Sequence, residues 1–290
     1  MKIFLVLALG FCLSYALDVD VYKHLIPNGQ TALLEFKNSD DISYKDVKVG
    51  DKNFDIVQNP KDSSKSYALI PFSYYEKQEN KQLYIHYTQN SKHKEEMILL
   101  KVIDGAYKKE SIQVSSSKVN PKSKAVKDRI SKEYKEAMRI YNTVTPHNYI
   151  TKPFIYPLKS KITSSFGKAR MYNGSLKGYH SGTDFRAKVG TPIVASNDGK
   201  VVLVKDRFYA GGTVVIDHGE GVYTCYFHMS KFDVKDGDVV RRGERIGLSG
   251  ESGRVTGPHL HFCARIKGVQ VDPLQLITLL NNNILKGKKQ

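Results

Sequence analysis

Short runs of alternating apolar and polar residues fill the first part of the chain after residue 16. The clearest examples are residues 32–36 (ALLEF), 83–87 (LYIHY) and 97–102 (MILLKV). Clusters rich in Asn-Gly, Asn-Pro, Ser, Asp and Lys separate these runs. A period of two between turns is typical of antiparallel strands with one buried face. We therefore predict an N-terminal antiparallel β-domain over residues 17–115.

The pattern changes after a polar tract at residues 115–121 (SSSKVNP). Residues 126–141 are rich in helix formers, with apolar or aromatic side chains at helical spacing and Pro146 just beyond. This spacing predicts one amphipathic helix. We assign residues 116–149 to a linker and this helix, which could pack on either neighbouring domain.

Strand-like runs return from residue 154, now with more glycine and histidine. The expected strands are residues 193–196, 199–204, 213–218, 222–228 and 259–266. The tripeptide Gly219-Glu220-Gly221 indicates a hairpin turn between two of them. We predict a second β-domain over residues 150–277 and a basic tail at 278–290, which makes the protein mainly β.

The first sixteen residues have the layout of a secretory signal peptide. Lys2 precedes an apolar run at residues 3–13, and Ser14-Tyr15-Ala16 forms a small-x-small cleavage pattern. The alternative is an uncleaved anchor, but the run is shorter than the roughly 20 residues that span a bilayer. We predict export to the periplasm or cell wall, with no integral membrane association after cleavage.

The chain is strongly basic, with 45 Lys and Arg against 29 Asp and Glu and a net charge of +16. Such an excess favours attraction to polyanions. The basic residues are spread along the chain without an arginine-rich tract, and an exported protein meets anionic wall polymers first. We expect no nucleic-acid partner, and a simply solvated surface explains the charge equally well. The oligomeric state cannot be predicted from these features.

Of the three cysteines, one lies in the predicted signal peptide, which leaves Cys225 and Cys263. Alternation places Cys263 on the strand face of His259 and His261, and places Cys225 opposite His228. If the strands are neighbours and all three histidines face one site, the sulfurs point to opposite faces. A disulfide is then not favoured.

Three short stretches carry residues suited to metal chemistry. They are residues 180–184 (HSGTD), 226–230 (YFHMS) and 257–261 (GPHLH). His259 and His261 share a strand face, and catalytic zinc takes three protein ligands with an open position for water. His180, Asp184 and one histidine of that pair would form such a set, and the other could act as general base. The alternative is hydrogen-bonded structural histidines, and spacing alone does not choose within the pair.

Residues from about 150 to 277 resemble the catalytic domain of the lysostaphin-like, LytM-type zinc endopeptidases of bacterial cell walls. The stretches that carry the resemblance are residues 179–185 (YHSGTDF), 226–230 (YFHMS) and 252–262 (SGRVTGPHLHF). Agreement extends to residues 189–195 (VGTPIVA), 199–201 (GKV) and 271–273 (VDP). The resemblance implies antiparallel sheets that present a zinc ion in an open groove.

The resemblance also implies roles for individual residues. His180, Asp184 and His261 match the zinc ligands, and His259 matches the catalytic base. His228 matches the histidine that orients water or stabilises the oxyanion.

Two further positions have less defined roles. His218 matches a frequent noncatalytic position, and we expect it to be structural. Arg170 precedes the first motif and could line the substrate groove, although a simple turn also explains this segment.

The function that follows is zinc-dependent hydrolysis of peptidoglycan stem-peptide cross-links, as a D,D-endopeptidase and also as a D,D-carboxypeptidase. One alternative is a glycyl-glycine endopeptidase, which the lack of a recognisable wall-binding module disfavours. Another is a noncatalytic activator of other wall hydrolases, which the complete ligand set disfavours. The N-terminal domain or the helix at 126–141 could gate the groove.

Overall fold

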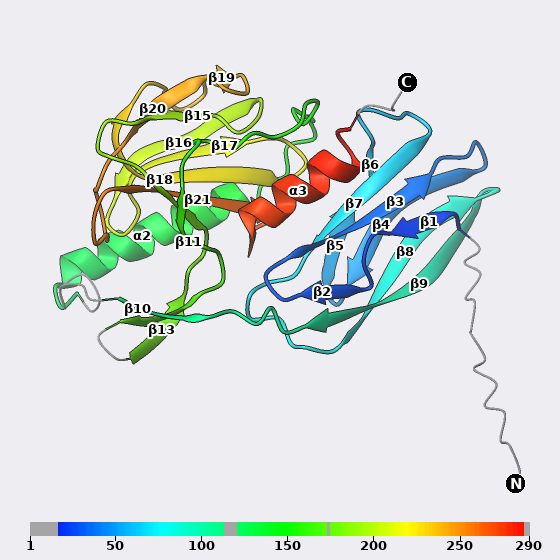
Figure 1. Ribbon diagram of the computed structural model, residues 1–290. Helices are drawn as coiled ribbons and strands as arrows, with labels where there is room; N and C mark the ends of the chain where they lie inside the picture. Colours follow the sequence, from blue (N-terminus) through cyan, green and yellow to red (C-terminus); the bar gives the residue numbers. More distant parts are fainter. Residues whose placement is uncertain (1–16, 113–120, 173–174, 287–290) are drawn as a thin grey trace, which may run out of the picture.

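The computed structural model describes residues 17–112, 121–172 and 175–286 (Figure 1). The predicted signal peptide lies outside these residues. Two β-domains lie side by side, with one helix, α2 (Lys124–Tyr141), on the outer side of the second domain. None of the described helices is long and apolar enough to cross a membrane.

The N-terminal domain is a pair of packed sheets. One has the order β1 (Val19–Val21), β3 (Thr31–Lys37), β7 (Lys65–Pro71) and β6 (Val57–Gln58). The other has the order β2 (Leu25–Pro27), β9 (Lys92–Ile103), β8 (Asn80–Gln89), β4 (Ile42–Val49) and β5 (Lys52–Asp55). Apolar residues from both sheets form one core. Every pairing is antiparallel except that of β2 with β9, so the predicted β fold of this region is confirmed, with one parallel pairing at the edge of a sheet.

The second domain is built on a 10-stranded antiparallel sheet. Its main path is β11 (Ile162–Ser164), β14 (Thr183–Arg186), β21 (His259–Ile266), β18 (Val222–Phe232), β17 (Gly211–Asp217), β16 (Gly199–Arg207) and β19 (Val239–Val240). The remaining strands are β15 (Pro192–Val194), β20 (Arg245–Ser249) and β22 (Val269–Val271). The mainly β fold with one linker helix is confirmed.

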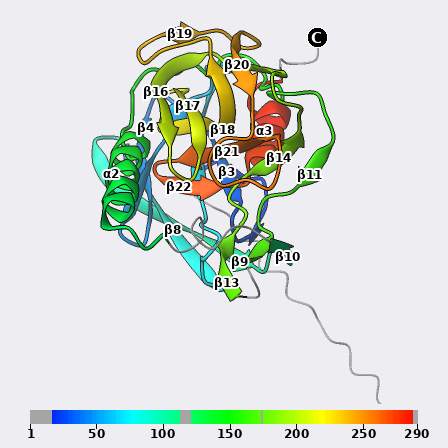
Figure 2. The ribbon, with the colours of Figure 1, turned by 90° about the vertical axis from the view of Figure 1, so that its left-hand side faces the viewer.

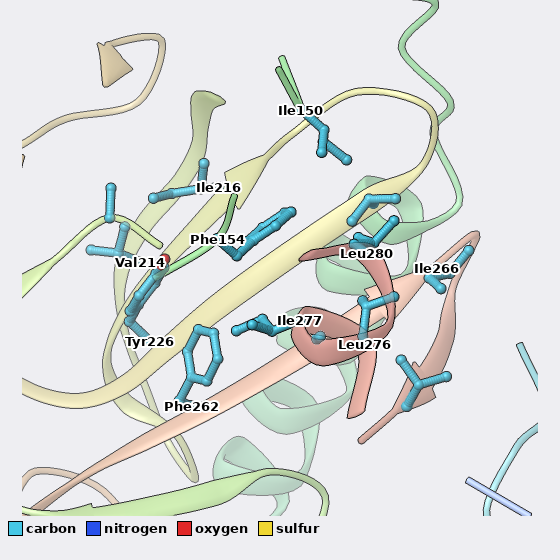
Figure 3. Packing of buried hydrophobic residues seen from close by; sticks show 14 of the residues in the cluster. Ile150, Phe154, Val214, Ile216, Tyr226, Phe262, Ile266, Leu276, Ile277 and Leu280 are labelled. Carbon is cyan, nitrogen blue, oxygen red and sulfur yellow. The ribbon is translucent and has the colours of Figure 1, made fainter. Parts of the chain in front are cut away.

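The two faces of this sheet have different coverings. Alternate residues of β21, such as Phe262 and Ile266, pack into a core with helix α3 (Pro273–Asn283) (Figure 3). Cys263, on the other face, packs with Ala137 of α2. The two helices therefore lie on opposite sides of the sheet (Figure 2).

Helix α2 begins two residues earlier than predicted, and Glu133 joins it to the β16–β17 hairpin. One carboxylate oxygen of Glu133 accepts from Arg129 at 2.7 Å, and the other accepts from the Phe208 amide at 2.9 Å. Tyr141 lies near the end of the helix and is buried against the sheet. α2 is thus fixed on the face that carries His259 and His261.

The prediction of a basic tail at residues 278–290 is wrong at its start, because helix α3 extends to Asn283. Asp272 caps it by accepting from the amides of Leu274 and Gln275. Leu280, which lies within the expected tail at 278–290, is almost fully buried in the core. Asp272 followed by Pro273 is a helix start signal, which the expected tail does not take into account.

The end of the N-terminal domain reaches into the second domain. Strand β10 (Lys109–Ile112) pairs in parallel with β12 (Ala169–Tyr172), which pairs with β13 (Ser175–Tyr179). The ring of Tyr74, from the N-terminal domain, stacks on Tyr179 with centroids 4.0 Å apart. This contact lies one residue before His180.

Candidate metal centre

Two neighbouring strands bring the predicted ligands together. β14 and β21 are antiparallel, and their register places Asp184 directly opposite His261. His180 directly follows β13, and its ring lies against both of these side chains. His180 Nε2 is 2.9 Å from Asp184 Oδ1 and 3.1 Å from His261 Nδ1, and the last two atoms are 2.8 Å apart. All three side chains are buried.

Gly182 permits this close approach. A Cβ at this position would lie 2.7 Å from His261 Nε2 and closer still to the carbonyl oxygen of Phe262. Any larger residue would therefore push β21 away from the segment that carries His180 and Asp184. The glycine between two ligands is a requirement of packing.

The hydrogen bonds of His180 fix its tautomer. Its Nδ1 lies 2.8 Å from the carbonyl oxygen of Ser165, which only accepts, so the ring proton is on Nδ1. The lone pair of Nε2 then faces the carboxylate of Asp184, and two acceptors at 2.9 Å need a cation between them. Ligands of a tetrahedral zinc ion stand roughly 3.3–3.6 Å apart, given bond lengths of about 2.0–2.2 Å. The donor set suits a divalent metal, and the three donor atoms need to spread only slightly to hold one.

The ionisation states of the ligands also fit a metal. Burial lowers the pKa of His261 to about 4, so its ring is neutral at pH 7. Burial alone would raise the pKa of Asp184, but the adjacent imidazoles of His180 and His261 outweigh this effect and hold the pKa well below its ordinary value. A neutral imidazole and an ionised carboxylate are the forms that bind metal ions.

Two more histidines stand beside the ligands. His259 Nδ1 lies 2.8 Å from the carbonyl oxygen of Gly257, and His228 Nδ1 lies 2.8 Å from that of Ser252. Both Nδ1 atoms therefore carry the proton, which leaves each Nε2 as an acceptor. The centroids of the His228 and His259 rings are 4.8 Å apart, and His259 Nε2 is 3.6 Å from Asp184 Oδ1. Burial lowers the pKa of His228 well below its ordinary value.

A β-bulge turns His228 toward this group. The register pairs that flank the irregularity are Val214↔Tyr226 and Gly212↔Met229. Between them lie one residue of β17 and two of β18, Phe227 and His228. The extra residue, His228, has a φ of 65°. Bulges re-aim side chains next to active sites, and this one reverses the face that alternation gives to His228.

The bulge also overturns the prediction for the cysteines. Cys225 and Cys263 are direct register partners and share the face covered by α2. We expected opposite faces because alternation was carried unbroken from Cys225 to His228. The extra residue of the bulge, between Tyr226 and Met229, shifts the alternation of faces along β18 by one position.

The remaining predicted residues lie apart from the three ligands or support them. An Nη atom of Arg170 is 3.5 Å from Asp184 Oδ2, so this side chain contacts a ligand of the candidate centre. His218 lies in the core, bonded to the Asp198 carbonyl at 2.6 Å and the Thr224 hydroxyl at 2.7 Å. These contacts agree with a structural role for His218.

Two supporting contacts were not predicted. Phe227 stacks its ring parallel to that of His261, with centroids 5.5 Å apart. Ser164 Oγ lies 3.1 Å from His180 Nδ1, beside the Ser165 carbonyl. The serine pair before Phe166 was visible in the sequence, but only the register of β11 against β14 shows that it meets His180.

Comparisons with known proteins agree with this geometry. Residues 178–273 match the model of Peptidase family M23. The chain is 46% identical over 123 residues to the peptidoglycan DD-endopeptidase ShyA of Vibrio cholerae, covering 41% of this chain and 29% of the relative. It is 40% identical over 125 residues to the DD-carboxypeptidase/endopeptidase Mpg of Neisseria meningitidis, covering 43% of this chain and 28% of the relative. The chain thus spans less than a third of the length of these relatives.

One solved structure resembles most of the chain. A crystal structure from Pseudomonas aeruginosa, assigned to peptidase M23, aligns with a TM-score of 0.65 and 26% identity over 86% of this chain and 93% of that one. That structure therefore shares the fold over most of the chain. Residues 178–273 form a domain of peptidase family M23, which confirms the family expected from the motifs.

Proposed function

We propose that this protein is a zinc-dependent peptidoglycan hydrolase that cleaves stem-peptide cross-links as a D,D-endopeptidase and also acts as a D,D-carboxypeptidase. The observation that carries the proposal is the convergence of His180, Asp184 and His261 with two proton-accepting histidines in an M23 domain. The names of the relatives from Vibrio and Neisseria support the choice of substrate.

The chain's own residues divide the chemistry between them. His180, Asp184 and His261 would hold zinc, which when bound lowers the pKa of a water and polarises the scissile carbonyl. His259, with Nε2 free to accept, takes the proton of the attacking water. His228 presents a second acceptor nitrogen, so water orientation suits its resting state better than donation to an oxyanion. Asp184 stays ionised throughout.

Arg170 would act through the carboxylate rather than on the substrate directly. Its contact with Asp184 Oδ2 leaves Oδ1 to face the imidazoles. A guanidinium in this place holds the orientation of the ligand. This role differs from the direct contact with the substrate groove that the sequence predicts for Arg170.

We further propose that the N-terminal domain regulates access to the site, which rests on the Tyr74–Tyr179 stack beside His180. Tyr75 also packs edge-on against Tyr179, with centroids 5.4 Å apart. Replacing Tyr74 with Ala removes the stacked ring without removing β10. Faster hydrolysis would support gating, and an unchanged rate would count against it.

The experiment that tests the function uses purified sacculi. The mature protein, a His259→Ala variant and a chelated sample are incubated with them, and the released muropeptides are identified. We expect metal-dependent loss of D,D-cross-linked dimers only with the intact protein. Sacculi with pentaglycine bridges test the glycyl-glycine alternative, and absence of cleavage in every wall type would exclude the peptidase activity.

A further inference from the structure

Cys225 and Cys263 lie opposite each other on two neighbouring strands of the 10-stranded sheet. They are register partners on β18 and β21, and both side chains are fully enclosed. Tyr141 of α2 covers them, with its hydroxyl 3.6 Å from the Cys225 sulfur. They are the only two cysteines in the described part of the chain.

The ladder of hydrogen bonds sets the distance between the two backbones. The Lys267 amide donates to the Gly221 carbonyl at 2.9 Å, so this facing pair is a hydrogen-bonded one. Such pairs recur at every second position, which makes Cys225 and Cys263, four positions along, another of them. Their Cα atoms are then about 5.5 Å apart, which is within the usual Cα span of a disulfide. Both thiols are free in this structure, and facing Cβ atoms in such pairs stand about 5.5 Å apart against about 3.5–4.5 Å in a disulfide, so the two strands must draw together locally to close the bond.

We propose that Cys225 and Cys263 form an intramolecular disulfide in the mature protein. The reaction is thiol–disulfide exchange with an external disulfide such as glutathione disulfide. The two cysteine thiols are oxidised to one S–S bond and lose two protons. The external disulfide is reduced and takes up these protons as two thiols.

The burial of the pair sets the order of events. No external disulfide can reach the sulfurs once Ala137 and Tyr141 have packed against the sheet. Exchange therefore takes place after β18 and β21 have paired and before α2 docks. The same cover afterwards protects the S–S bond from reductants.

The disulfide has a consequence for the metal centre. It joins the strand that carries His228 to the strand that carries His259 and His261. Cys263 lies two residues from His261, and Cys225 lies two residues from Phe227, which stacks on that ligand. The bond would hold the two strands in register below the site.

The test is refolding of the mature chain, from residue 17, out of guanidinium in a glutathione redox buffer with zinc. The product is alkylated in denaturant and digested without reduction. We expect a cross-linked peptide pair containing Cys225 and Cys263, with no alkyl group on either. Two alkylated cysteines per chain, or glutathione on each without a cross-link, would overturn the proposal.

Two further experiments test the disulfide, one with single-cysteine variants and one with reduced wild-type protein. Cys225→Ser and Cys263→Ser should each retain one thiol that accepts an alkyl group or glutathione. Wild-type protein refolded with reductant should melt roughly 5–10 °C below the oxidised protein, because the bond constrains the unfolded chain. Equal melting temperatures would contradict a bond that stabilises the sheet.

Discussion

Asp184 and His261 face each other across two antiparallel strands, with Asp184 Oδ1 2.8 Å from His261 Nδ1. Register alone sets this contact, because the two residues are 77 positions apart in sequence. His180 joins them from the end of the preceding strand, four residues before Asp184. The metal centre is therefore a product of sheet pairing.

Removal of the carboxylate charge should abolish tight metal binding. We predict that Asp184→Asn weakens zinc affinity by at least about 100-fold, since even hydrogen-bond partners of ligands contribute 10–100-fold. Competition with a chromophoric chelator measures the change. Asp46→Asn is the matched control, because Asp46 contacts His86 at 2.6 Å in the other domain. Equal losses in both variants would contradict a metal role for Asp184.

A methyl group between the ligands should separate the strands. Gly182→Ala places a Cβ against His261 and the Phe262 carbonyl, so we expect both zinc affinity and thermal stability to fall. Gly257→Ala is the control, because a Cβ there meets nothing within 4 Å and Gly257 is not among the positive-φ glycines. Calorimetry of the two proteins measures the difference. A fully stable Gly182→Ala protein with normal metal binding would show that the close approach is not required.

Because the backbone of His228 is left-handed, different residues at this position should differ in how much they destabilise the protein. Asn tolerates this conformation, whereas a β-branched residue is strained in it. We expect His228→Val to lower the free energy of unfolding by about 1–3 kcal/mol more than His228→Asn does. Both variants should lose hydrolytic activity. Denaturant titration separates the two effects, and equal stabilities would argue against the bulge.

Acid should destabilise the second domain through His218. Burial lowers its pKa to about 4 from an ordinary value of 6.5, so the unfolded chain binds the extra proton between these pH values. The neutral ring thus contributes stability above pH 6.5 that is lost as the pH falls toward 4, in total about 3 kcal/mol. Urea unfolding in a chelator, at pH 7 and 4.5, should show a smaller decrease for His218→Gln. Parallel decreases would exclude this residue as the cause.

Local patterns in the sequence predict much of this structure. Alternation located the strands that carry His228 and His261, and helical spacing located α2 to within two residues at its start. The motifs alone group His180, Asp184 and His261 into one candidate metal site. Short-range periodicity is sufficient for such features because it reports directly on burial.

The features that were missed depend on a single inserted residue or on long-range pairing. The bulge at His228 changes the parity of one strand, and no local pattern separates it from regular alternation. The helix after Asp272 was hidden because its cap also belongs to the last family motif. The stack of Tyr74 on Tyr179 joins two domains, so neither segment indicates it alone.

The most direct test of the account is the cleavage of a purified D,D-cross-linked muropeptide dimer by metal-stripped protein during titration with zinc. We predict no product without metal, a rate that rises to a maximum at about one zinc ion per chain, and no activity at any zinc level for His261→Ala. Cleavage by the stripped protein, or an intact dimer in the presence of fully zinc-loaded protein, would contradict the account.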